Sequence, residues 1–155
     1  MAWPPVLAAI VAAAAALFGY WLTYMSKRSE GKKEIYAKAL AAVEAYKQLP
    51  YRICRRGEST PETRRNLGKI IGDVQQELSF YRRFLRLDSE AVGIAYDALV
   101  DKVFAHGRQF RATAWSMPPA PEDKDMDIST VFNYNDSFEQ RACLVAMRKE
   151  LQRRF

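Results

Sequence analysis

The sequence predicts an all-α protein, in which a single N-terminal transmembrane helix continues into a cytoplasmic bundle of about four helices. Residues 2–26 include no Asp, Glu, Lys, Arg or His. After them, apolar residues recur every three or four positions, as on one face of a helix, and alternating strand patterns are nearly absent. We therefore divide the chain into an anchor at 1–26, a basic juxtamembrane flank at 27–34 and a helical bundle at 35–155, which contains a long loop at 117–135.

The uncharged segment is long enough to cross a bilayer. As a helix, residues 3–24 would span about 33 Å, compared with about 30 Å for the hydrocarbon core. Trp3 lies at one end of this span and Tyr20, Trp21 and Tyr24 at the other, as in the aromatic belts at membrane interfaces. A cleaved signal peptide is the alternative, but such peptides usually begin with a basic region and have a shorter apolar core. We expect an uncleaved anchor.

Four cations follow the predicted span directly, and none precedes it: Lys27, Arg28, Lys32 and Lys33. The positive-inside rule therefore places the N-terminus outside and the remainder of the chain in the cytoplasm. The small size and the simple anchor favour the inner (plasma) membrane of a prokaryotic cell. The same cations can contact anionic lipid headgroups, each contributing about 1 kcal/mol near the surface.

Small side chains line one edge of the predicted span: Ala8, Ala12, Ala15 or Ala16, and Gly19. Such an edge lets two membrane helices approach closely and associate. An alanine-rich run also produces these spacings by chance, so helix association and coincidence remain alternatives.

The first bundle helix is expected to continue the anchor, unless Gly31 interrupts it, and to end before Pro50. A basic connection follows at 51–58. Ser59 and Glu62 then have capping-box spacing, which predicts a helix start. The apolar positions of these two helices are Ile35, Ala39, Ala42, Val43, Tyr46 and Leu49, and then Leu67, Ile70, Ile71, Val74, Leu78, Tyr81 and Leu85. Further apolar residues at Phe80, Phe84 and Leu87 predict burial on two sides near the end of the second helix.

Two more helices are predicted. Asp88 or Ser89 caps a helix with Val92, Ala95, Tyr96, Leu99, Val103 and Phe110 facing inward, which ends near Trp115. The segment 117–135 is rich in proline and acidic residues, and we expect a loop with a short strand at 129–132. Asp136 or Ser137 then caps the last helix, whose inward positions are Phe138, Ala142, Val145 and Leu151.

The charge pattern argues against nucleic acid as the main partner. Lys27, Arg28, Lys32 and Lys33, taken together with Glu30, account for half of the net charge of +6. The segments 81–86 and 108–115 interleave cations with aromatic residues, as in proteins that bind single-stranded nucleic acid. Helical periodicity, with rings inward and arginines outward, explains the same pattern. A basic docking patch is predicted at Arg55, Arg56, Arg64 and Arg65. Cys54 and Cys143 are expected to stay reduced in the cytoplasm.

The sequence offers little support for catalysis. His106 is the only histidine, so an imidazole-based triad or a multi-histidine metal site would depend on this one ring. Asp97 and Asp101 share a helical face and could bind a divalent cation with Asp73 or Glu77, although solvated carboxylates explain them better. The common nucleotide-binding and acyl-transfer motifs do not occur. We expect no catalytic residues, no cofactor, no metal and no small-molecule substrate.

These observations favour a non-enzymatic, single-pass membrane protein whose helical module serves as a docking, scaffold or accessory subunit. Its partners would be membrane lipids and another protein, or a second copy of the same chain. One alternative is a membrane-active effector, whose spans cluster through the small-residue edge. A third hypothesis is a membrane-tethered enzyme or a nucleic-acid binder.

Overall fold

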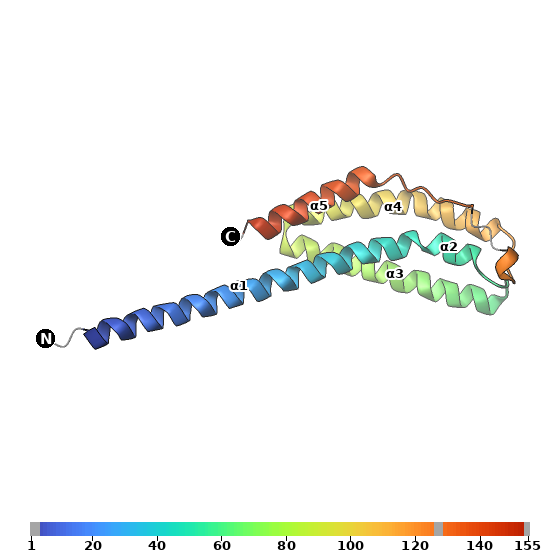
Figure 1. Cartoon of the computed structure of the whole chain (residues 1–155). Coiled ribbons are helices and arrows are strands. Elements are labelled where there is room, and N and C mark those ends of the chain that lie inside the picture. The colour runs from blue at the N-terminus through green and yellow to red at the C-terminus, as the bar shows by residue number, and fades with distance from the viewer. Residues whose placement is uncertain (1–3, 126–128, 154–155) are drawn as a thin grey trace. The chain divides into compact units, whose positions relative to one another are not determined.

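The computed structural model describes the backbone of residues 4–125 and 129–153 (Figure 1). Side chains are described from residue 16 onward, apart from residues 22, 25, 26, 28, 29 and 123. The described residues form α-helices and one 3₁₀ turn, with no strand among them. The all-α prediction is therefore confirmed.

The chain forms two compact units, Met1–Tyr36 and Ala37–Phe155. The first helix, α1, extends over Pro4–Lys47, so that Gly31 lies inside it. Within the described residues, no helix combines the length and the apolar character that crossing a bilayer requires. The predicted transmembrane helix is thus not supported by the structure. The side chains of its first part, which include Trp3, Ala8, Ala12 and Ala15, lie outside the described residues.

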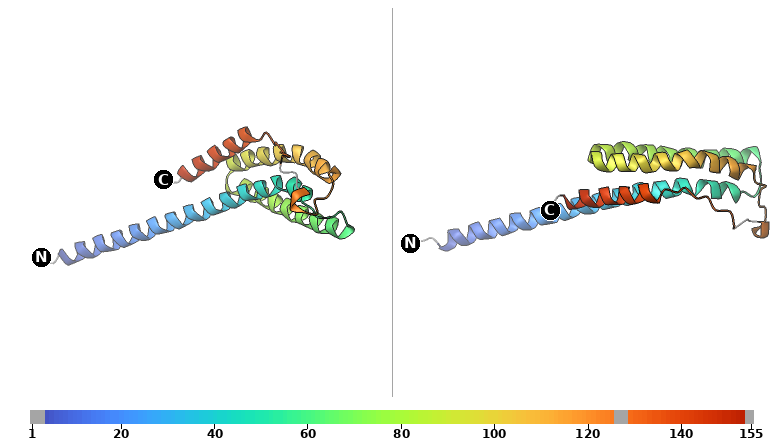
Figure 2. Two further views of the ribbon diagram at one scale, coloured as in Figure 1. Left: turned by 45° about the vertical axis from the view of Figure 1, so that its right-hand side comes forward. Right: turned by 90° about the horizontal axis from the view of Figure 1, so that it is seen from above.

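The second unit is an antiparallel helical bundle. Its elements are the last turns of α1, followed by α2 (Leu49–Cys54), α3 (Pro61–Asp88), α4 (Glu90–Ser116), the 3₁₀ turn η1 (Asp123–Asp125) and α5 (Ser137–Gln152). Successive long helices run in opposite directions, and α3 and α4 form one layer while α2 and α5 lie in the other (Figure 2). Helix α4 is central because it packs against α2, α3 and α5.

The core is apolar and was largely predicted. Its fully buried side chains include Tyr46, Leu49, Ile53, Leu78, Leu85, Val92, Tyr96, Leu99, Val100, Val103 and Cys143. The Tyr96 hydroxyl in this core is satisfied, since it donates to the Ala39 carbonyl oxygen at 2.9 Å. This bond ties α4 to α1 where the surrounding side chains are apolar.

Local sequence signals start α3, but one residue later than predicted. The N-cap is Thr60 rather than Ser59, and its hydroxyl accepts a hydrogen bond from the Thr63 amide at 3.2 Å. Pro61 occupies the first turn, where its missing N–H leaves no bond unmade. The basic connection predicted at 51–58 is also partly helical, because Pro50 lies at the start of α2 rather than after the end of a helix.

Helix α3 turns directly into α4 through the single residue Ser89, whose backbone is extended. A Cβ at Gly93 would lie 2.8 Å from the Cα of Arg86, so only glycine allows the two helices to meet so soon after the turn. The predicted helix boundary at Asp88 and Ser89 agrees with this geometry, although the Ser89 side chain makes no capping hydrogen bond.

The segment before α5 is extended, but it is not the short strand that the sequence predicts at 129–132. Phe132 and Tyr134 are buried, whereas Val131 before them and Asn133 between them are exposed. The Phe132 amide donates to the Tyr51 hydroxyl at 2.9 Å, and Tyr134 packs edge-on against Phe110. The alternating pattern therefore comes from packing on the bundle, since the segment pairs with side chains rather than with a neighbouring strand.

Two predicted inward faces are wrong. On α5, Phe138 is 79% exposed and Val145 is also exposed, while Cys143, Met147 and Glu150 are buried. Both sets have helical spacing, but α5 buries only the set that contains Cys143 and Met147. On α3, Phe80 is 58% and Leu87 is 88% exposed, because the helix packs through Leu78, Tyr81 and Leu85 instead.

Candidate functional site

Helix α1 exposes large apolar side chains in the part of the first unit whose side chains are described. More than half of the surface of each is accessible: Leu17, Phe18, Tyr20, Trp21 and Tyr24. Lys27 and Lys33, which follow, are exposed, and Lys32 is half-buried. A Cβ at Gly19 would meet no atom within 4 Å, so the side of the helix at that residue is open. The side chain of Arg28 lies outside the described residues.

Arginines of α3 and carboxylates of α4 form an ion-pair network near the α3–α4 turn. Arg82 Nε donates to Asp97 Oδ1 at 2.9 Å, and Arg86 Nε donates to Asp97 Oδ2 at 2.7 Å. Arg82 Nη2 also lies 2.8 Å from Asp101 Oδ1. The two carboxylates that the sequence raised as possible metal ligands are thus neutralised by guanidinium groups. No three metal-ligating side chains come together in the described part of the chain.

Arg56 is a structural residue rather than part of a basic docking patch. It is only 6% exposed, unlike Arg55, Arg64 and Arg65. Its Nη1 atom donates to the carbonyl oxygens of Ile53, at 2.9 Å, and Ala114, at 3.1 Å.

The Arg56 guanidinium also closes the end of α4. Its Nη2 atom donates to the carbonyl oxygens of Trp115 and Met117, and the group stacks on the Trp115 ring. The last carbonyl groups of a helix have no partner within the helix. Arg56 supplies partners for those of both α2 and α4, and thereby joins the two helix ends.

An arginine pocket lies between α1, α3 and α4. Its lining consists of Tyr46, Gln75, Ser79, Phe104, Arg108 and Arg111, and its volume is roughly 330 Å³. The Arg111 guanidinium donates to the Tyr46 hydroxyl and lies 5.0 Å from the centre of the Tyr46 ring. Tyr46 itself is buried against Phe104, with ring centres 4.7 Å apart. The guanidinium of Arg111 is therefore held in place by the ring and the hydroxyl of Tyr46.

The position of Tyr46 depends on close packing at Gly107. A Cβ at Gly107 would lie 2.5 Å from Cε1 and 2.9 Å from the hydroxyl oxygen of Tyr46. Only glycine thus lets the tyrosine ring reach under Arg111. Gln75 and Ser79 of α3 line the pocket, and the Ser79 hydroxyl donates to the Gln75 carbonyl oxygen at 2.9 Å.

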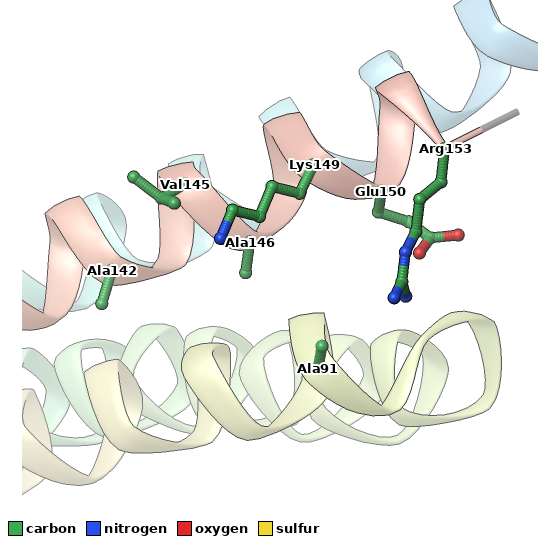
Figure 3. A pocket seen from close by; sticks show the side chains of 7 residues that line it. All are labelled: Ala91, Ala142, Val145, Ala146, Lys149, Glu150 and Arg153. Atoms are coloured by element: carbon green, nitrogen blue, oxygen red, sulfur yellow. The ribbon is translucent and has the colours of Figure 1, made fainter. Parts of the chain in front are cut away.

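A second hollow, of roughly 400 Å³, lies between α4 and α5. Ala142 and Ala146 of α5 point toward α4, which contributes Ala91, and Glu150 and Arg153 close one end (Figure 3). Alanine and valine side chains line its middle, and the charged groups of Lys149, Glu150 and Arg153 are of both signs, so it favours no ligand charge as the arginine pocket does.

Lys47 joins α1 to the start of α5. Its Nζ atom lies 3.0 Å from Asp136 Oδ2 and 3.2 Å from Glu44 Oε1. Burial alone would lower the pKa of Lys47, but the hydrogen bonds to Asp136 and Glu44 outweigh it and raise this pKa. Asp136 precedes α5 as predicted, yet its carboxylate binds Lys47 instead of capping the helix.

The remaining nucleophilic and basic candidates are separate from one another. Cys54 and Cys143 are free thiols, and burial raises the pKa of Cys143 to about 11. His106 is half-buried, and its Nδ1 atom lies 3.0 Å from the Lys102 carbonyl oxygen. Cys54 contacts the sulfur of Met117 at 3.4 Å. These side chains form no catalytic group with one another.

Comparison of the chain with family models, with curated proteins and with solved structures finds no match. Function is therefore inferred from the surfaces of the chain itself. The sequence points to the segment 108–115, but not to the contact of Arg111 with Tyr46 or to the pocket shared with Gln75, which lie more than thirty residues away. The i, i+4 spacing of Arg82 with Arg86 and of Asp97 with Asp101 was the signal that could have revealed the ion pairs.

Proposed function

We propose that this chain is a non-catalytic, membrane-anchored helical module that binds other proteins through its bundle. The observation that carries the proposal is the run of exposed apolar side chains on α1, from Leu17 to Tyr24, immediately before Lys27. Each such side chain gains about 1.5–3 kcal/mol when it leaves water for an apolar environment.

A bilayer is the environment that we favour for this run. The sequence from residue 2 to 26 carries no charge, and the rings of Tyr20, Trp21 and Tyr24 lie just before the cations, where an interface would be. A soluble partner would also cover the rings, but it would not by itself explain the uncharged stretch that precedes them. We retain the orientation with the N-terminus outside and the bundle in the cytoplasm.

The proposed docking surface is an apolar stripe on α3, formed by the exposed Phe80 and Leu87 and the half-buried Phe84. Their spacing of four and three residues places them on one face, and the rings of Phe80 and Phe84 stack 5.9 Å apart. A helix face with this spacing suits another amphipathic helix, whose apolar ridge fits between the side chains. We therefore propose a helical segment of a partner protein as its occupant.

The membrane anchor is tested by one charge in the predicted span. Ala13→Arg places a cation near its centre, at a cost of about 3 kcal/mol on insertion scales, whereas Ala13→Leu is the matched control. Wild type and the control should remain with membranes after extraction at alkaline pH, and Ala13→Arg should be released. Release of the wild type under the same conditions would contradict the anchor.

The stripe is tested by photo-crosslinking in intact cells. A crosslinking residue in place of Leu87 should give one discrete product, and the same residue at the exposed Gln109 of α4 should give none. Equal products at both positions, or none at Leu87, would reject the stripe. Light scattering of the full chain in detergent then reports whether the partner is a second copy.

A further inference from the structure

We propose that the arginine pocket binds a phosphate group, carried either by a small phosphate ester or by a lipid headgroup. The pocket is defined above by Tyr46, Gln75, Ser79, Phe104, Arg108 and Arg111. This role goes beyond the proposed anchoring and docking, and it does not depend on either.

The positive charge of the pocket is uncompensated. Arg108 and Arg111 are three residues apart on α4, so both guanidinium groups lie on one side of the helix. Within the described residues, no carboxylate lies at ion-pair distance from either of them. The arginines of α3, by contrast, are paired across the same helix interface with Asp97 and Asp101.

The residues opposite the two arginines explain why they stay unpaired. In this antiparallel pair of helices, α3 runs back along α4, so that Arg82 faces Asp97 and Asp101, while Gln75 and Ser79 lie nearer to Arg108. Two neutral side chains therefore occupy the place where carboxylates would complete the ion-pair pattern. An incoming anion would supply the missing negative charge.

The pocket is organised before a ligand arrives. Arg111 is fixed by its hydrogen bond to the Tyr46 hydroxyl and by the Tyr46 ring beneath it. Tyr46 is 1% exposed and cannot move without opening the core. A guanidinium that is already held in place loses less conformational entropy when it binds, which strengthens binding.

Phosphate is the anion that fits these donors best. Each guanidinium can offer two parallel N–H groups to two oxygens, and the Gln75 amide can donate from α3. Because the donors come from two helices, they suit a tetrahedral group with oxygens in several directions. A volume of roughly 330 Å³ leaves room for the group that carries the phosphate.

The test measures thermal unfolding of the full chain in detergent micelles, with inorganic phosphate added against sodium chloride of equal ionic strength. We expect phosphate to raise the melting temperature of the wild type and chloride to leave it unchanged. Arg108→Gln should weaken phosphate binding about tenfold or more, because charge-assisted hydrogen bonds are lost. Arg65→Gln, which removes an equally exposed charge from α3 outside the pocket, should bind as the wild type does.

A second pair of probes distinguishes the two sources. Glycerol 1-phosphate represents a soluble ester, and phosphatidic acid in phosphatidylcholine micelles represents a lipid headgroup. The probe that stabilises the wild type more strongly, and loses that effect in Arg108→Gln, identifies the source. Arg108 is exposed, so its replacement should leave the fold intact, as circular dichroism would show. A wild type that does not respond to any of these phosphates, or an equal response in Arg108→Gln, would overturn the proposal.

Discussion

The two ends of the helical bundle satisfy their arginines in different ways. At the hairpin end, where Ser89 connects α3 to α4, Arg82 and Arg86 are neutralised by carboxylates of the facing helix. At the α2 end, Arg56 is satisfied by carbonyl oxygens, and Arg108 lies beside a pocket without a carboxylate partner among the described residues. Arginines are thus paired with carboxylates at the hairpin end. At the α2 end, one arginine bonds to carbonyl oxygens and another has no carboxylate partner among the described residues.

This difference indicates where a ligand is expected. An ion pair between two helices holds their relative position and leaves no net charge for a third group. An arginine such as Arg56, whose N–H groups donate to carbonyl oxygens at helix ends, has those donors engaged within the fold. The guanidinium groups of Arg108 and Arg111 line one pocket and pair with no carboxylate among the described residues, although Arg111 also bonds to Tyr46. Substitutions at one end of the bundle at a time test this difference.

The largest effect is expected from Arg56→Ala. It leaves the terminal carbonyl groups of α2 and α4 without their partner, and hydrogen bonds to a charged group contribute about 1.5–3 kcal/mol each. We expect the free energy of unfolding to fall by about 3 kcal/mol, since water can replace some of these bonds. Chemical unfolding followed by circular dichroism measures it.

The neighbouring Arg55 supplies the control for Arg56. Arg55 is exposed, so Arg55→Ala should change stability by less than about 0.5 kcal/mol. Arg56→Lys should recover little, because a single ammonium cannot reach carbonyl groups on two helices. Equal stability of Arg55→Ala and Arg56→Ala would show that the buried arginine does not hold the α2 end together.

Gly107→Ala should be the next most damaging change. Its Cβ would lie 2.5 Å from Cε1 of Tyr46 and force the ring away from α4. Overpacking of this kind costs about 1–3 kcal/mol. Gly72→Ala on α3 is the matched control, because its Cβ would meet no atom within 4 Å and alanine favours a helix.

The glycine pair also links the packing to the pocket. If Tyr46 positions Arg111, then Gly107→Ala should weaken phosphate binding while Gly72→Ala leaves it unchanged. Undiminished binding in a folded Gly107→Ala variant would contradict that support role.

Asp97→Asn tests the hairpin end. The carboxylate accepts hydrogen bonds from Arg82 and Arg86, and its loss would leave both guanidinium groups without their shared partner. We expect a loss of about 1–2 kcal/mol, which is moderate because Arg86 is half exposed and water can replace the partner. At about 1 M salt, where the Debye length is about 3 Å, the difference from wild type should shrink. A difference that is independent of salt would point to packing instead of charge.

The smallest change in stability is expected from Gln75→Glu, and its sign is opposite. The new carboxylate would pair with the arginines of the pocket, as Asp97 does at the other end, and stabilise the fold by up to about 1 kcal/mol. The same variant should lose phosphate binding, because the pocket is then neutralised from within. Thermal unfolding with and without phosphate measures both effects in one experiment. Retained phosphate binding together with unchanged stability would show that Gln75 does not face the arginines.

The sequence by itself determined the helices and most of the core. Spacing of three and four residues predicted α3 and α4, and turn chemistry placed their boundary near Ser89. These signals are local, because a helix bonds to itself and its start and end are set by residues within a few positions. The uncharged run before Lys27 is equally a property of the sequence, and its membrane role stays a prediction.

The tertiary structure alone decided which of two apolar faces is buried and which arginines are used. On α5 both Phe138 and Cys143 belong to faces with helical spacing, and only the position of α4 selects Cys143. Arg55 and Arg56 are adjacent in the sequence, yet Arg55 is exposed, whereas Arg56 is buried and donates to carbonyl oxygens at the ends of α2 and α4. Periodicity records how a helix is patterned, whereas burial and charge pairing depend on contacts between residues far apart in the chain.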